Sequence, residues 1–505
     1  MKFLKPTINR FLSISIALII QIVVLVVVSK FFEGQTDTIN ALIRFLSILV
    51  VLFIISEKCN PSIKMAWVVF ILITPVFGSL LYILIGGKRP RKKLREAIMK
   101  SEAENRKYKN TLVSASEELK KQNESLYIQS RYLENIGFPV LKNTYAQYYP
   151  LGDDAFPVML RELEKAEKFI FMEYFILDDG KMLSAIVDVL ERKAKAGVDV
   201  RLIYDDMGSL FSLPHGYDKL LEEKGIKCIS FNPFLPVISA AMNNRDHRKI
   251  TVIDSRVGFT GGINIADEYI NEIEKYGHWK DNAFMLEGEG VKAFTLLFLD
   301  MWHALRDKNE NISSFLPDEK HSFNEGFVQP FSDSPLDDEL TGENVYLNAI
   351  NGAKKYIYIY TPYLIPDHEL NSALCLAAKK GVDVKIIVPG IPDKKIVYSM
   401  TKSYYGTLIS SGVEIYKYPP GFIHAKGFVC DDEICCGGTI NLDFRSMCHH
   451  FECGCVFYNA PVVMQMKLDM LKTLEECQKV EEYARFTGVV GSAYHAVLRL
   501  IAPLM

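Results

Sequence analysis

The stretch His247–Asp254 reads HRKITVID, and the stretch His424–Asp431 reads HAKGFVCD. In each, a lysine follows the histidine by two positions, an aspartate ends the motif, and a Gly-Gly pair comes shortly afterwards. A single copy of so short a pattern is common by chance. Two copies with matching sequels predict an internally repeated fold.

The repeat extends well beyond the two motifs. Each half contains an apolar, aromatic strand, then a helical stretch, then a strand that begins Gly-Val-Asp-Val. The matching segments are 165–177 and 352–365, 197–200 and 381–384, and 224–231 and 411–418. Strands that alternate with helices favour parallel pairing through crossover helices, so we expect an α/β sandwich in each half.

The two histidines suit phosphodiester chemistry. A neutral imidazole can attack phosphorus, and a second imidazole can protonate the departing oxygen. His247 and His424 supply one imidazole each. Lys249 and Lys426 follow at a spacing that places them on the same strand face as their histidines, so we expect both ammonium groups to point at one phosphate.

The aspartates and asparagines have less direct roles in our interpretation. Asp254 and Asp431 complete the candidate catalytic set, but each is expected in the turn after a strand, where aspartate binds local backbone amides. Asn264 and Asn441, just after the Gly-Gly pairs, either donate to the phosphate or cap the next helix.

Two more acids follow the motifs, Asp281 in HWKD and Glu452 in HHFE. A carboxylate on the second ring nitrogen of a histidine fixes its tautomer and stabilises the imidazolium that forms during catalysis. We expect both acids to support the histidines in this way. The alternative is that they are ordinary surface carboxylates.

The N-terminal region has the composition of a membrane anchor. Residues 11–29 and 64–85 are apolar runs long enough to cross a bilayer, and 42–55 is a shorter run, so we expect two or three spans and favour three. Basic residues crowd positions 88–95 and place the following body in the cytoplasm. Lys2, Lys5 and Arg10 also favour an inside N-terminus, which requires an even number of spans.

Composition restricts the remaining choices. The net charge of −3 over 505 residues disfavours nucleic acid as a partner. Ten cysteines without a paired framework indicate a reducing compartment and no disulfides. Cys453 and Cys455 beside His449 and His450 lack the usual zinc spacing, so no metal and no cofactor are expected.

These features divide the chain into four parts. We expect a membrane anchor at 1–87, a basic and polar helical connector with a solvated charged face at 88–140, a first lobe at 141–325 and a second at 326–505. The apolar stretch 231–241 and the C-terminal tail 496–505 either meet lipid or pack in the core.

The chain resembles the bacterial cardiolipin synthases of the phospholipase D superfamily. The resemblance covers nearly everything from about residue 60. It rests on the stretches EYFIL, HRKITVID, GGINIADEY, HWKD, TPYLIP, PGFIHAKGFVCD, GGTINLDFRS and RLIAPL. One departure is visible, because His449 and His450 stand where the family usually has Leu-Asn.

The resemblance implies two lobes whose motifs meet across a pseudo-twofold axis to build one active site. It implies transfer of a phosphatidyl group between two phosphatidylglycerol molecules at a bacterial cell membrane, through a phosphatidyl-histidine. His247 would be the nucleophile and His424 the acid and base, although the sequence does not exclude the reverse. The rival readings are a membrane-anchored hydrolase or nuclease of the same superfamily, and a non-catalytic scaffold. Other acceptor alcohols, such as phosphatidylethanolamine, and the oligomeric state stay open.

Overall fold

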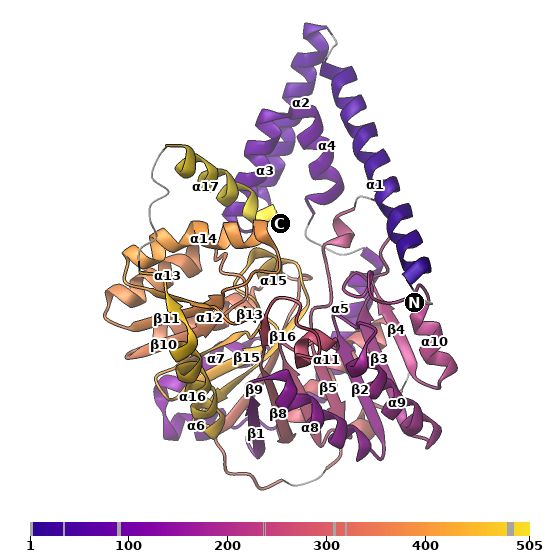
Figure 1. Ribbon diagram of the computed structural model, residues 1–505, viewed down its shortest axis with the longest axis vertical. Helices are drawn as coiled ribbons and strands as arrows, with labels where there is room; N and C mark the ends of the chain where they lie inside the picture. The colour runs from indigo at the N-terminus through magenta and orange to yellow at the C-terminus, as the bar shows by residue number, and fades with distance from the viewer. Residues whose placement is uncertain are drawn as a thin grey trace.

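Two α/β lobes form the body of the protein, and four N-terminal helices project from it (Figure 1). The computed structural model describes residues 4–33, 36–87, 92–235, 237, 239–306, 310–318, 321–481 and 489–504. Each lobe is built on one mixed sheet, and the strand orders of the two sheets correspond. The expected internal duplication is therefore present in the fold.

The first sheet has the order β1-β8-β6-β5-β2-β3-β4. Its strands are β1 (Thr144–Tyr149), β2 (Phe169–Tyr174), β3 (Asp199–Asp205), β4 (Lys227–Phe231), β5 (Ile250–Ile253), β6 (Val257–Gly261) and β8 (Ala283–Gly288). Strands β2, β3 and β4 pair in parallel through α9 (Lys181–Lys195) and α10 (Tyr217–Glu223), which confirms the crossover prediction. The other pairs are antiparallel, and between β5 and β6 the short turn allows no crossover.

The second sheet has the order β17-β12-β11-β10-β14-β15-β16-β9. Its strands are β9 (Phe327–Asp333), β10 (Tyr356–Tyr360), β11 (Asp383–Pro389), β12 (Glu414–Tyr418), β14 (Gly427–Cys430), β15 (Ile434–Gly438), β16 (Glu452–Tyr458) and β17 (Gln478–Lys479). Again three strands, β10, β11 and β12, are parallel. The helices α12 (Thr341–Gly352), α13 (His368–Lys379), α14 (Lys395–Ser410) and α16 (Pro461–Glu476) complete this lobe.

The two lobes share one core. The rings of Phe284 on β8 and Phe457 on β16 stack with centroids 5.1 Å apart, and α11 (Glu289–Leu305) is buried almost throughout its length. A Cβ atom on Gly437 would lie 1.9 Å from the ring of Phe284 in the first lobe, and one on Gly262 would lie 2.9 Å from the carbonyl oxygen of His424 in the second lobe. The Gly-Gly pairs are therefore required for the close approach of the lobes.

The N-terminal helices differ from the expectation. Helices α1 (Leu4–Glu33) and α2 (Asp37–Ser56) are each long and apolar enough to cross a membrane. The run 64–85 does not form the expected single spanning helix. The helix is interrupted at Thr74 and Pro75, which separates α3 (Pro61–Ile73) from α4 (Pro75–Ile85). Two candidate spans, rather than the favoured three, lie within the described residues.

The connector is more closely attached to the body than its polarity suggests. Helix α5 (Lys92–Lys109) packs along α11, where Asn105 donates to Asp300 at 2.8 Å and Lys109 pairs with the same carboxylate at 2.6 Å. Helices α6 (Ser116–Gln122) and α7 (Glu124–Asn135) follow, and α7 contacts the second lobe. Lys92, Glu96 and Lys100 of α5 are exposed, as expected of a solvated charged face, but the opposite face of the helix packs on the body. Lys88, Arg89 and Arg91 of the basic cluster lie outside the described residues.

The C-terminal segment returns to the N-terminal helices. Helix α17 (Val489–Ile501) and the short helix η4 (Ala502–Leu504) contact α3, and α17 also packs on α14 (Figure 1). The ten cysteines lie within the described residues, and none of them forms a disulfide.

Candidate active site

The site forms where backbone segments of the two lobes pair with each other as β-strands. Strand β7 (His278–Lys280) of the first lobe pairs in parallel with β13 (Gly421–Ile423) of the second. The equivalent bridge joins Asp246 to Phe451. Both motif histidines are fixed by these crossings, because the amide of each hydrogen-bonds across the boundary between lobes.

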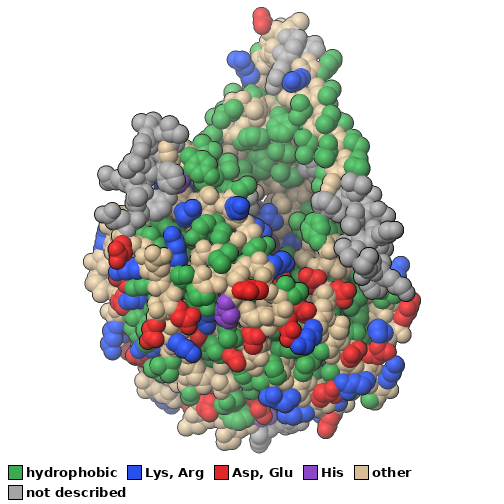
Figure 2. All heavy atoms as spheres, viewed as in Figure 1, with side chains coloured by type: hydrophobic (Ala, Val, Ile, Leu, Met, Phe, Trp, Pro, Cys, Tyr) green, Lys and Arg blue, Asp and Glu red, His purple; other side chains and the backbone are tan. Residues whose placement is uncertain are grey.

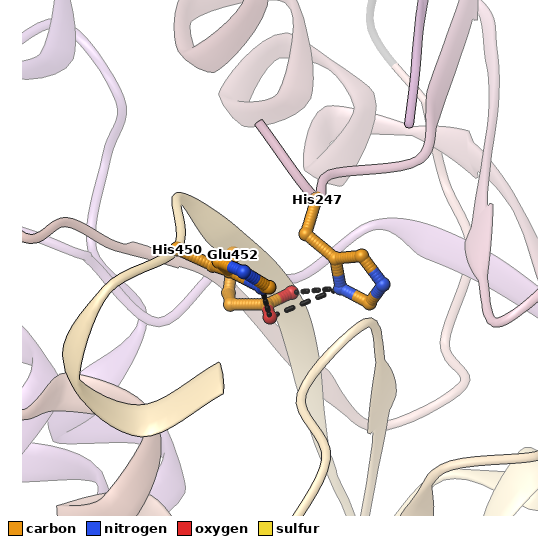
Figure 3. Close-up of side chains that lie close together, drawn as sticks. All are labelled: His247, His450 and Glu452. Carbon is orange, nitrogen blue, oxygen red and sulfur yellow. Dashed lines mark hydrogen bonds and ion pairs between the residues drawn. The ribbon is translucent and has the colours of Figure 1, made fainter. Parts of the chain in front are cut away.

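Each histidine receives its carboxylate from the opposite lobe. Nδ1 of His247 lies 2.9 and 3.0 Å from the carboxylate oxygens of Glu452. Nδ1 of His424 lies 2.7 Å from Oδ2 of Asp281. Both carboxylates are fully buried, so the alternative that they are ordinary surface carboxylates is wrong. In Figure 3, Nε2 of His247 points away from Glu452, which leaves this nitrogen for chemistry.

One cavity of about 880 Å³ is lined by both histidines. Its wall also carries cationic, acidic, aromatic and apolar side chains. These include Lys275, Lys394, Arg445, Asp178, Glu268, Asp393, Phe175, Tyr269, Tyr276, Trp279, Tyr363, Phe422, Met207, Phe211, Val397, Met400, Ala502 and Leu504. The two motifs therefore contribute to a single site.

The motif lysines are buried and held by the backbone. Lys249 and Lys426 do not sit within strands as expected, because β5 begins at Ile250 and β14 at Gly427. Each ammonium group donates to the carbonyl of its own motif histidine, at 2.7 Å for Lys249. Nζ of Lys426 also lies 2.7 Å from Nδ1 of His424, and neither lysine is among the residues that line the cavity described above.

The motif aspartates stabilise the fold through hydrogen bonds to backbone amides. Asp254 and Asp431 each adopt a left-handed backbone directly after a strand, with φ of 55° and 54°. The carboxylate of Asp254 accepts from the amides of residues 167, 168 and 169 at 2.7–2.8 Å, and that of Asp431 accepts from those of 354, 355 and 356 at 2.7–2.9 Å. The position of each aspartate in a turn after a strand was predicted correctly. The amides that it binds were expected nearby in the sequence, but they lie at the start of the neighbouring strand, β2 or β10.

The two asparagines differ from each other. Asn264 accepts from the amide of Ile176 and donates to the Tyr269 hydroxyl at 2.7 Å. Asn441 lines the cavity, and its Oδ1 is buried without a hydrogen-bond partner among the described residues. Neither caps the next helix, since the N-caps are Ala266 and Asp443, so that alternative is wrong.

Burial controls the charges of the site. It lowers the pKa of His424 to about 4, with help from the charge of Lys426, and lowers that of His247 well below 6.5, with help from Lys249. It also lowers the pKa of Lys249 to about 8 and that of Lys426 to about 7. Near neutral pH both imidazoles are therefore neutral, and Lys426 is poised to gain or lose a proton.

Several side chains around the site were not singled out from sequence. Thr439 and Ser446 donate to the Glu452 carboxylate, the latter at 2.6 Å, and their only sequence signal was proximity to the second motif. The Phe175 ring meets His247 edge-on with centroids 5.0 Å apart, and Tyr269 meets His424 at 5.2 Å. His450 was noted only as a departure from the family pattern, yet it lies 5.3 Å from His247 between ring centroids.

Two similar α/β lobes that each place a His-x-Lys-x-x-x-x-Asp motif in one cavity define a phospholipase D-type enzyme. A family model described as "Cardiolipin synthase, PLD-like domain" matches residues 159–290 and 346–473, and one described as "Phospholipase_D-nuclease N-terminal" matches residues 45–87. The chain belongs to the cardiolipin synthase family, and it is an enzyme of the phosphatidyltransferase class.

Individual relatives agree with this assignment. A cardiolipin synthase of Clostridium perfringens is 34% identical over 89% of this chain and 95% of its own. One from Alkalihalophilus pseudofirmus is 32% identical over 93% and 94%. Among solved structures, phosphatidylserine synthase of Haemophilus influenzae Rd KW20 covers 75% of this chain and all of its own with a TM-score of 0.57 at 15% identity, a similarity of fold.

Proposed function

We propose that the protein joins two phosphatidylglycerol molecules into cardiolipin and glycerol, without a cofactor. The observation that carries the proposal is the pair of cross-lobe contacts, His247 with Glu452 and His424 with Asp281, facing one cavity. Two aligned imidazoles are what a two-step displacement at phosphorus requires. Membership of the cardiolipin synthase family supports the choice of substrate.

In the first step, Nε2 of His247 attacks the phosphorus of phosphatidylglycerol. A nitrogen–phosphorus bond forms, the bond from phosphorus to the glycerol headgroup breaks, and His424 gives its proton to the departing glycerol oxygen. The low pKa of His247 keeps its attacking nitrogen unprotonated. His424 must first be protonated, and the arriving phosphodiester anion favours this because it stabilises the imidazolium.

In the second step, the terminal hydroxyl of another phosphatidylglycerol gives its proton to His424 and attacks the same phosphorus. The nitrogen–phosphorus bond breaks and cardiolipin leaves. Glu452 and Asp281 stabilise the two imidazolium states, and Lys249 and Lys426 offset charge on the phosphoryl oxygens. Asn441 is the remaining candidate donor to those oxygens.

A transferase must favour an alcohol over water. The cavity wall includes apolar side chains from distant parts of the chain, among them Met207, Phe211, Val397 and Leu504. Met207 and Phe211 are 37% and 65% exposed, so they form a rim that lipid chains can cover. Covering this rim would exclude water from the phosphatidyl-histidine.

The location of the cavity fits a lipid substrate. Hydrophobic side chains cover the projecting helices, whereas charges of both signs cover the body below (Figure 2). The cavity-lining helix η4 touches α3 of this projection. If α1 and α2 both cross the membrane, the N-terminus and the body would lie on one side of it, and the positive-inside rule favours the cytoplasm for that side.

The test is product analysis with the full chain reconstituted in phosphatidylglycerol vesicles. We expect cardiolipin and glycerol in equal amounts, and a phosphatidyl group trapped on His247 when the reaction is quenched early. His247→Ala should abolish both. Phosphatidic acid as the main product would establish the rival hydrolase, and cleavage of added DNA would establish the nuclease.

A further inference from the structure

His450 is a buried histidine without hydrogen bonds beside the proposed nucleophile. Its side chain is 9% exposed and lines the active-site cavity. Neither of its ring nitrogens has a hydrogen-bond partner among the described residues. A buried polar group left without a partner is costly unless a ligand satisfies it.

The neighbours of His450 have the chemistry of metal ligands. Nδ1 of His450 lies 3.6 Å from Oε1 of Glu452, which is too long for a hydrogen bond, and the same carboxylate lies 2.9 Å from Nδ1 of His247. One ligand atom from each of the three residues can be chosen so that all lie within 4.8 Å of one another (Figure 3).

We propose that His247, His450 and Glu452 bind a divalent cation of the Zn²⁺ type, and that this cation reversibly switches the enzyme off. Two imidazoles and one carboxylate suit Zn²⁺, which takes such ligands at about 2.0–2.2 Å and so needs them roughly 3.3–3.5 Å apart. Measured to the single oxygen Oε1 of Glu452, the separations are 3.0 Å from Nδ1 of His247 and 3.6 Å from Nδ1 of His450, and these bracket that spacing. The third separation must shorten modestly, and the fourth position is left for water.

The backbone holds the three ligands in place from both lobes. His450 lies in the bend two residues before Glu452, the first residue of β16, and Nδ1 of His450 is 3.6 Å from the Glu452 carboxylate. His247 is tied to that segment because its amide donates to the carbonyl of Phe451 at 2.9 Å. The site is therefore assembled by backbone contacts between the lobes and does not depend on a flexible loop.

The inhibition follows from the tautomer of His247 and rests on the proposed function. While Nδ1 donates its proton to Glu452, Nε2 carries the lone pair that attacks phosphorus. A cation bound at Nδ1 takes the place of the proton on that nitrogen, and this proton moves through solvent to Nε2. The imidazole stays neutral, no proton is gained or lost overall, and the attacking nitrogen becomes a donor.

The experiment is a titration of the purified full chain in nanodiscs with Co²⁺, whose visible absorption reports its ligands. We expect ligand-field bands without a thiolate charge-transfer band in the wild type. The bands should be lost in both His450→Asn and His450→Gln and retained in the matched control His449→Asn. Unchanged bands in both His450 variants, no bands in the wild type, or a thiolate band from the neighbouring cysteines would each overturn the site.

A second measurement tests the switch. Zn²⁺ should inhibit cardiolipin formation in a way that a chelator reverses. The half-inhibiting concentration, taken against each variant's own zinc-free rate, should rise at least about tenfold in His450→Asn and stay unchanged in His449→Asn. Normal cardiolipin formation by a protein that shows no Co²⁺ bands would refute the cation site and leave the proposed function standing. Co²⁺ bands in a protein that makes no cardiolipin would refute the proposed function and leave the cation site standing.

Discussion

Asp281 lies 143 residues before His424 and in the other lobe, yet its Oδ2 is 2.7 Å from Nδ1 of that histidine. Although burial works to raise the pKa of Asp281, the charges of His424 and Lys426 hold it below its usual range. The carboxylate is therefore ionised throughout the neutral range. It can fix the proton of His424 on Nδ1 and leave Nε2 for proton transfer.

Replacing this carboxylate should impair chemistry more than binding. We expect Asp281→Asn to lower kcat by about 10²–10⁴-fold with little change in KM, because an amide no longer fixes the tautomer or stabilises an imidazolium. The measurement is initial-rate cardiolipin formation over a range of phosphatidylglycerol in mixed micelles. Asp393→Asn, which alters a cavity-lining acid without a hydrogen bond to either histidine, is the control. A rate within threefold of wild type would rule out the alignment role.

Replacing a motif aspartate should impair stability more than chemistry. Asp254→Ala removes the acceptor for three backbone amides and should cost about 2–4 kcal/mol, seen as a lower thermal midpoint in detergent. The fraction that remains folded should keep a kcat within a fewfold of wild type. A large loss of kcat at an unchanged midpoint would instead make Asp254 part of the chemistry.

Substrate binding should take up protons. At pH 8 Lys426, with a pKa of about 7, is mostly neutral in the free enzyme, and an arriving phosphodiester anion favours its charged form. The part of this uptake that is due to Lys426 should fall towards zero below about pH 6, where the lysine is already protonated. Calorimetric titration with glycerophosphoglycerol in two buffers of different ionisation enthalpy measures it. Lys426→Met should show less uptake at pH 8, and equal uptake in both proteins would contradict the assignment.

The apolar rim should matter only at a bilayer. Phe211→Glu should raise the apparent KM on phosphatidylglycerol vesicles several-fold, because a charge replaces an exposed ring in the rim that we propose lipid chains cover. Activity on a monomeric short-chain phosphatidylglycerol should change little. Val113→Glu, at an exposed position that does not line the cavity, is the control. Equal losses on both substrates would indicate damage to the site rather than to membrane contact.

The repeat made much of the fold predictable. The matching strand segments anticipated the parallel triplets β2-β3-β4 and β10-β11-β12, because apolar periodicity and Gly-rich strand starts are local signals. The break at Thr74 and Pro75 was missed, since a proline inside an apolar run is tolerated in some membrane helices and ends others.

The exchange of carboxylates between lobes could not be read from sequence. Asp281 and Glu452 each follow a motif at a similar distance, so spacing is equally consistent with pairing inside a lobe or across lobes. Only the docking of β7 against β13 decides between these. His450 was undervalued for the same reason, because its nearness to His247 depends on the contact between Asp246 and Phe451.

The crossed pairs also bear on how such a chain could have originated. Since each imidazole depends on an acid from the opposite half, a single ancestral half would have had no oriented histidine by itself. A second copy docked around a twofold axis would have supplied both missing acids at once. Fusing two such genes would join partners that already needed each other, and today neither half should be separable from the other without silencing both.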